Sequence, residues 1–199
     1  MPVPIKVIIG LGNPGPEYSD TRHNAGFWFV DELVGHLHGE FKQDKKFHGD
    51  TTRLLKDEID CRILKPQVFM NHSGRAVQAI VDYFDYEPGE ILIAHDEIDL
   101  SAGTVRLKKG GGHGGHNGLR DIIEVTGNSD FLRLRIGVGH PGFKDEVIDY
   151  VLNRPSAEDK REIDEAIERA IEIMPMVFRG EMNKAMTLLN APHPTPEPD

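Results

Sequence analysis

The sequence contains one cysteine, Cys61, so the chain can form no disulfide within itself. It also lacks any run of about 18 apolar residues, the length that a helix needs to cross a bilayer. Its first residues, MPVPIKVIIG, lack the long apolar core and the small-residue cleavage site of a secretory signal. We therefore expect a cytoplasmic protein with no membrane association, in which Cys61 is a buried and unreactive thiol.

Positive charge is scarce in the chain as a whole. Lys and Arg number 23 against 33 Asp and Glu, which gives a net charge of −10 and disfavours a protein that coats long stretches of nucleic acid. Residues 104–144, however, hold seven basic side chains and three acidic ones. A basic stretch on an acidic body is compatible with a small phosphate site, and also with ordinary solvated charges.

Strand-like and helix-like segments alternate along the chain. Apolar or alternating patterns predict strands at 6–10, 47–55, 60–65, 91–97, 104–109 and 131–139. Helical periodicity predicts helices at 27–39, 73–84 and 119–125, and a longer helix that Ser156 and Asp159 cap and that Pro175 bends or ends. In the last strand, Arg133 and Arg135 alternate with apolar residues and are expected on its exposed face.

This alternation predicts an α/β fold: a single domain with a twisted, mixed and largely parallel central sheet flanked by helices on both faces. We expect this domain to span residues 1–190. The remaining residues, 191–199, read APHPTPEPD, and this proline-rich composition predicts a disordered tail.

Polar residues follow two of the predicted strands, at the edge of the sheet where ligands collect in such folds. The segment GNPGPEYSDTRHNAG follows the first strand, and HDE ends the strand at 91–97. His23 and Asp96 could meet there as a base and its orienting carboxylate, able to take a proton from water near neutral pH. The alternative, that His23 merely caps the following helix, stays open.

The stretch GGGHGGHNG, residues 110–118, contains six glycines in nine residues, so its backbone can approach a ligand closely. It matches neither a P-loop nor a dinucleotide fingerprint. His113 and His116 could hold a metal together with His23 and Asp96, but no further Cys or His pattern accompanies them. Asn117 could cap the next helix or bind substrate.

Two asparagines near loop ends are the remaining candidate groups for binding a substrate or a water. Asn13 and Asn71, near loop ends, each supply a donor and an acceptor for a peptide or a water. No Ser, Thr or Cys stands in a nucleophile-elbow context, so direct attack by water is the simplest reaction.

From about residue 5 to residue 190, the chain resembles the bacterial-type peptidyl-tRNA hydrolase family. Four long blocks carry the resemblance in the expected order: GLGNPGPEYSDTRHNAGFWFVDEL, KPQVFMNHSGRAV, ILIAHDEIDLSAGTVRLKKGGGHGGHNGLRDII and FLRLRIGVGHPG. The resemblance implies a carboxylic ester hydrolase that cleaves the ester between the peptide and the 3′-terminal ribose of peptidyl-tRNA. It implies no cofactor and no metal, a monomer without an obligate protein partner, and binding of the acceptor stem and 3′ end of tRNA.

The resemblance also assigns roles to individual residues. It implies His23 as the catalytic histidine, Asp96 as its carboxylate partner, and Asn13, Asn71 and Asn117 as amides that position substrate and water. It further implies that the peptide and the 3′ end contact Tyr18, Met70 and His116, and that the tRNA 5′-phosphate binds Lys108 and Arg135.

Two features depart from the family's pattern. The overall acidity is unusual for a tRNA-binding enzyme, and Lys109 stands where an apolar residue is common in the family. The runner-up function is a non-catalytic RNA-binding relative of the kind that serves in splicing. The set of His23, Asp96 and three asparagines disfavours that alternative.

Overall fold

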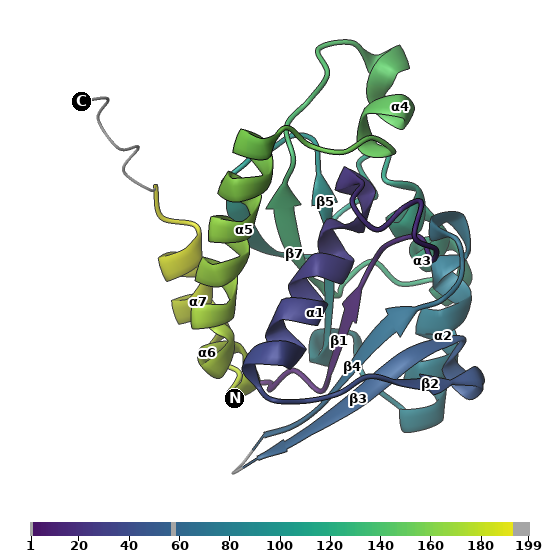
Figure 1. Ribbon diagram of the computed structural model, residues 1–199. Coiled ribbons are helices and arrows are strands. Elements are labelled where there is room, and N and C mark those ends of the chain that lie inside the picture. Colours follow the sequence, from purple (N-terminus) through teal and green to yellow (C-terminus); the bar gives the residue numbers. More distant parts are fainter. Residues whose placement is uncertain (1, 57–58, 193–199) are drawn as a thin grey trace.

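Four parallel strands form the centre of a mixed sheet (Figure 1). The computed structural model describes residues 2–56 and 59–192, and within them seven strands pair in the order β2-β3-β4-β1-β5-β7-β6. Strands β4, β1, β5 and β7 run parallel, whereas β2, β3 and β6 pair antiparallel at the two edges. The bounds are β1 Val7–Gly10, β2 Lys42–Asp44, β3 Gly49–Lys56, β4 Ile59–Pro66, β5 Ile91–Glu97, β6 Val105–Lys109 and β7 Leu132–Gly137.

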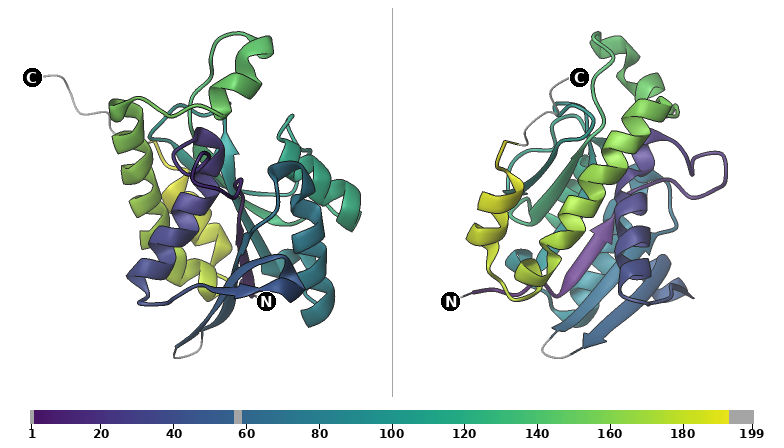
Figure 2. Two further views of the ribbon diagram at one scale, coloured as in Figure 1. Left: turned by 45° about the vertical axis from the view of Figure 1, so that its right-hand side comes forward. Right: turned by 60° about the vertical axis from the view of Figure 1, so that its left-hand side comes forward.

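Helices cover both faces of this sheet, which confirms the predicted α/β fold. Figure 2 shows the sheet between α1 and α5 on one side and α2 and α3 on the other. The central strands can therefore be apolar on both faces, and β1 is buried along its whole length. In the described residues the helices are α1 Ala25–His36, α2 Ser73–Phe84, α3 Asn117–Thr126, α4 Val147–Val151, α5 Ala157–Glu172, α6 Met174–Phe178 and α7 Met182–Leu189.

Two glycines allow the start of α1 to lie directly against the sheet. A Cβ on Gly26 would collide with the carbonyl oxygen of Ala94 in β5, and a Cβ on Gly10 in β1 would collide with the carbonyl oxygen of Gly26. This close approach places the turn that precedes α1, η1 (Arg22–Asn24), at the carboxyl end of β5. The glycines thus fix how near His23 can come to Asp96.

Helix α5 begins at its predicted cap and ends before Pro175. The Ser156 Oγ accepts a hydrogen bond from the backbone N–H of Asp159 at 3.0 Å, which confirms the predicted cap of α5. Pro175 lies in the first turn of α6, so α5 ends before it. Of the predicted tail, residues 193–199 lie outside the described residues.

The sequence did not predict the edge strand β2, the single-turn helix α4 or the helix α7. Helix α4 lies above the carboxyl ends of the parallel strands (Figure 1). In the described part of the chain, no helix has both the length and the apolar character needed to cross a membrane.

Candidate active site

A cleft of about 590 Å³ opens at the carboxyl edge of the parallel strands, beneath α4. The loop after β1, the end of β5, the turn before α2 and the start of α3 all contribute to its walls. Among its lining residues are the predicted Asn13, His23, Met70, Asn71, Asp96, His116 and Asn117. The strand-end argument brought His23 and Asp96 together in this place, and the family resemblance supplied the other residues of the set.

A larger hollow, of about 740 Å³, lies near the opposite edge of the sheet, between β2, β3 and the end of α2. Its arginines are already engaged: Arg53 forms two hydrogen bonds of 2.7 Å with Asp60, and the Arg62 guanidinium lies 3.8 Å from the centre of the Phe84 ring. None of the described residues that line it was predicted to act in a reaction. We therefore place the chemistry in the smaller cleft.

His23 and Asp96 form a direct, buried hydrogen bond. Nδ1 of His23 lies 2.8 Å from Oδ1 of Asp96, and the two residues are 8% and 3% exposed. An ionised carboxylate can only accept, so Nδ1 carries the hydrogen and Nε2 keeps its lone pair. Because His23 lines the cleft, this tautomer provides a base there, and helix capping does not account for the contact.

The pair shifts the titration of both groups. Burial lowers the pKa of His23, but the charge and the hydrogen bond of Asp96 outweigh burial and raise this pKa above its ordinary value. Burial opposes ionisation of Asp96, yet His23 and His116 together hold the pKa of this carboxyl well below its usual range. Asp96 is therefore ionised at neutral pH, and His23 loses its basic form as the pH falls through its raised pKa.

His116 is a second hydrogen-bond donor to the same carboxylate oxygen. Its Nε2 lies 2.8 Å from Oδ1 of Asp96, while its Nδ1 accepts the backbone N–H of Leu119 at 3.3 Å. His116 is thus the N-cap of α3, and the prediction that Asn117 could cap this helix was wrong. The capping bond shows that Nε2 carries the hydrogen.

The positions of the hydrogens on His23 and His116 also test the alternative that these residues hold a metal ion. The facing atoms of His23, Asp96 and His116 lie within 4.8 Å of one another, close enough to surround an ion. However, both imidazoles direct an N–H, and not a lone pair, at the carboxylate. The cluster is therefore explained as a hydrogen-bonded carboxylate, and His113 stands apart, its Nδ1 accepting the N–H of Gly115 at 3.0 Å.

Asn13 is held with its amide group in one orientation. Its Oδ1 accepts the backbone N–H of Met70 at 2.7 Å, and its own backbone N–H and C=O bond to the side chain of Asn24 at 2.8 and 3.0 Å. Among the described residues no hydrogen-bond partner is found for Nδ2 of Asn13, which leaves that N–H₂ available to the cleft. Asn24 was missed from the sequence, although it directly follows His23.

The other predicted substrate residues lie around the same cleft. Met70 is buried in its wall, and Asn71 and Asn117 are exposed on its rim. Tyr18 packs edge-on against Phe69, with ring centres 6.1 Å apart, and Phe69 lines the cleft. Phe69 was another residue that the sequence analysis missed.

The two predicted phosphate ligands lie outside the cleft, on one face of the β6–β7 pair. Lys108 is exposed and pairs across the strands with Arg133, while Arg135 pairs with Arg106. The Arg135 Nε donates to Oε2 of Glu97 at 3.0 Å, so this guanidinium already has one acidic partner. Because Lys108 lies opposite Arg133, two residues before Arg135, Lys108 and Arg135 are diagonal neighbours across the two strands.

Arg133 is buried, and the prediction that it lies on an exposed face was wrong. It is 3% exposed, and its guanidinium donates to the carbonyl oxygens of Gly111, Gly112 and Ser129. The glycine-rich loop covers this part of the strand and supplies acceptors for the buried charge. Strand alternation alone gave no sign of that cover.

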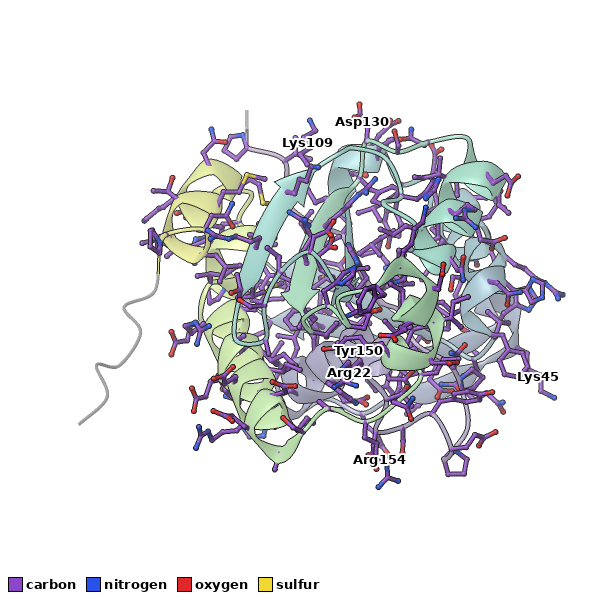
Figure 3. The ribbon with its side chains drawn as sticks, turned by 90° about the horizontal axis from the view of Figure 1, so that it is seen from above. Arg22, Lys45, Lys109, Asp130, Tyr150 and Arg154 are labelled. Atoms are coloured by element: carbon purple, nitrogen blue, oxygen red, sulfur yellow. The ribbon has the colours of Figure 1, made fainter. Side chains whose placement is uncertain are left out.

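Arg22 ties the turn that carries His23 to the segment that carries α4. Its Nη1 donates to the carbonyl oxygens of Tyr150, Asn153 and Arg154 at 3.1, 3.2 and 3.0 Å. Its guanidinium carbon lies 3.9 Å from the centre of the Tyr150 ring, and Figure 3 shows the two side chains next to each other. This arginine thereby fixes the segment that roofs the cleft beside the turn that carries His23.

Comparisons with known proteins agree with the resemblance. The family profile described as peptidyl-tRNA hydrolase matches residues 7–197. The chain is 54% identical over 186 residues to the peptidyl-tRNA hydrolase of Halorhodospira halophila, which covers 94% of this chain and 96% of the relative. It is 52% identical over 187 residues to that of Legionella pneumophila, which covers 94% and 99%.

Solved structures show the same fold. The crystal structure of peptidyl-tRNA hydrolase from Acinetobacter baumannii superposes with a TM-score of 0.91 at 46% identity, over 94% of this chain and 95% of that one. The structure of a peptidyl-tRNA hydrolase in complex with N-propanol gives a TM-score of 0.93 at 46% identity, over 96% and 97%.

Proposed function

The chain belongs to the peptidyl-tRNA hydrolase family, and from this premise we propose that His23 is the general base in its hydrolysis of peptidyl-tRNA. The observation that carries the proposal is the 2.8 Å bond from His23 Nδ1 to Asp96, which leaves the lone pair of Nε2 for a water in the cleft. The non-catalytic RNA-binding alternative is set aside, because the family is one of hydrolases.

The reaction proceeds by direct attack of water on the ester carbonyl. His23 Nε2 takes a proton from the water while the oxygen forms the bond to the carbonyl carbon. The tetrahedral intermediate then expels the 3′-terminal ribose oxygen, which takes the proton back from the imidazolium of His23. Asp96 stabilises the imidazolium throughout and orients the ring.

Asn13 is the preferred donor for the oxyanion. Its Oδ1 is committed to Met70, so the group that it offers to substrate is an N–H, which suits a developing negative charge. Asn71 and Asn117, at the rim, bind the first peptide amide and help to hold the water. A free α-amino group lacks that amide and carries a charge, so these residues favour peptidyl-tRNA over aminoacyl-tRNA.

The peptide occupies the apolar part of the cleft. Met70 and Phe69 form one wall, and Val147 and Ile148 of α4 contribute to the lining as well. Ile148 is 65% exposed, so its side chain is accessible to an apolar group of the peptide. Such contacts recognise apolar side chains by area and so give little preference for one peptide sequence.

Lys108 and Arg135 bind the 5′-phosphate of the tRNA, at the side of the molecule next to the glycine-rich loop. The double variant Lys108→Ala/Arg135→Ala is expected to raise KM for peptidyl-tRNA and to leave kcat nearly unchanged. Removal of each cation that binds the phosphate should reduce the slope of log(1/KM) against log salt by about 1. The measurement is KM between about 50 and 200 mM salt, the range over which phosphate contacts weaken strongly.

Lys42→Ala is the matched control, because Lys42 is exposed on β2, at the sheet edge opposite to β6. A short peptidyl-nucleotide ester lacks the 5′-phosphate, so its hydrolysis should respond little to salt or to the double variant. Equal salt slopes for wild type and double variant would refute the phosphate site. A cytoplasmic location and a monomeric state remain predictions.

A further inference from the structure

Asp96 accepts two imidazole N–H groups on the same oxygen. His23 Nδ1 and His116 Nε2 each lie 2.8 Å from Oδ1, and the two rings are tilted with centres 4.9 Å apart. Both nitrogens of His116 are engaged, since Nδ1 accepts from Leu119. In this arrangement His116 acts on Asp96, and it offers no nitrogen to a substrate.

A second donor weakens the hold of the carboxylate on the first. Each N–H takes up part of the negative charge of Oδ1, so the imidazolium form of His23 gains less than it would gain from an unshared carboxylate. Among the described residues, the other charged or titratable groups near the pair are Arg22 on the turn of His23 itself, His95 against the ring of His116, and Glu97, Arg120, His113, His140 and Lys144 around the cleft. Asp96 and His116 are the two with direct contact to the His23 ring or its partner atom.

We propose that His116 is a positioning residue, whose N–H fixes the Asp96 carboxylate and limits how strongly it stabilises protonated His23. This inference rests on the proposed function of His23 as the base. By limiting that stabilisation, His116 keeps more of His23 in its basic form at neutral pH. It also fixes the direction of the Asp96 oxygen to which the His23 ring is aligned.

His95 supports this role from beneath. Its ring is buried and packs edge-on against His116 with centres 5.0 Å apart, and its Nδ1 donates to the carbonyl oxygen of Asp96 at 2.8 Å. Burial, helped by the nearby His116, lowers the pKa of His95 to about 3, so the ring stays neutral. Among the described residues its Nε2 has no partner. A neutral ring here supports His116 without adding a charge to the cluster.

Two substitutions of nearly equal size test the two nitrogens of His116 separately: Nδ1, which caps α3, and Nε2, which donates to Asp96. In His116→Asn the side-chain oxygen can replace Nδ1 as the acceptor that caps α3, because Asn is a favoured N-cap, but the side chain is too short to reach Asp96. In His116→Gln the amide N–H₂ extends to where Nε2 lies and can still donate to Asp96. His116→Ser, a second capping residue without that donor, repeats the test if the Asn variant does not fold.

The direct readout is the titration of His23 by NMR, together with the acidic limb of kcat/KM. In the Asn variant, both midpoints should rise by about half to one pH unit, because Asp96 then serves His23 alone. In the Gln variant, both should stay close to wild type. Thermal unfolding of each variant checks that the fold is retained.

An unchanged His23 titration in the folded Asn or Ser variant overturns the inference. If KM for peptidyl-tRNA rises while the titration stays in place, His116 contacts the acceptor end of the tRNA instead. The NMR titration needs no turnover, so this result is independent of whether His23 is the base. That proposal fails separately, if a variant without His23 still hydrolyses the substrate.

Discussion

His23→Ala is expected to lower kcat for peptidyl-tRNA by about 10⁴-fold, the upper end of what a positioned general base contributes. The loss should be this large because, among the described residues, no other base accompanies His23 at Asp96: His116 directs an N–H at the carboxylate and accepts a backbone N–H with its other nitrogen. The affinity for tRNA should change little, since the proposed phosphate ligands lie outside the cleft. The measurements are single-turnover hydrolysis and the binding of deacylated tRNA.

His36→Ala is the matched control for this change. His36 ends α1, the helix that follows the turn of His23, and its side chain is 49% exposed beside Glu32. Its removal should leave both rate and affinity at wild-type values. Hydrolysis by His23→Ala within about tenfold of wild type would exclude this residue as the base.

Asp96→Asn is expected to lower kcat by about 10³- to 10⁴-fold, a loss like that seen when the carboxylate of a Ser-His-Asp triad is changed in the same way. The amide is the same size, so the cluster can still pack. It carries no charge, however, and an amide N–H turned toward His23 would force the hydrogen onto Nε2, where the lone pair is needed.

The pH dependence of Asp96→Asn shows whether Asp96 acts on His23 through its charge or only through its shape. Without the carboxylate, the burial of His23 is no longer outweighed, so the pKa of His23 should fall and the acidic limb of kcat/KM should move to lower pH. This direction is opposite to that expected for His116→Asn. Asp99→Asn, at an exposed carboxylate shortly after β5, is the control. An acidic limb that stays in place in Asp96→Asn would contradict the electrostatic role of Asp96.

Local patterns were sufficient for much of the fold and for part of the site. Apolar runs and helical periodicity predicted the central strands and α1, α2, α3 and α5, because each buries a face with a regular repeat. The rule that ligands collect at the carboxyl ends of parallel strands was sufficient to bring His23 and Asp96 together. The family resemblance then selected the same pair.

What the sequence could not predict depends on contacts between distant segments. The bond from His116 to Asp96 joins the cap of one helix to the end of a strand, and no spacing in the sequence marks it. Arg133 obeys the strand alternation but is covered by the glycine-rich loop, whose carbonyls it satisfies. Helix α4 has five residues, too few for a periodic pattern, and Arg22 holds its end by bonds to three carbonyl oxygens.

The proposed phosphate site itself contains an acidic residue, Glu97, beside one of its cations. Arg135 shares its charge with Glu97, whereas Lys108 is exposed and Lys109 lies at the end of β6, on the outer rim in Figure 3. Attraction for tRNA would therefore come from a few exposed cations, and it should be strongly reduced by salt.

The central claim is that the basic form of His23, held by Asp96, activates water without a metal. The most direct test compares the acidic limb of kcat/KM, measured on a defined peptidyl-tRNA in EDTA, with the NMR titration of His23 in the same protein. We predict full activity in EDTA and a limb whose midpoint coincides with the His23 titration. Activity that is lost in EDTA and restored by a metal ion, or a rate that stays constant while His23 titrates, would contradict the account.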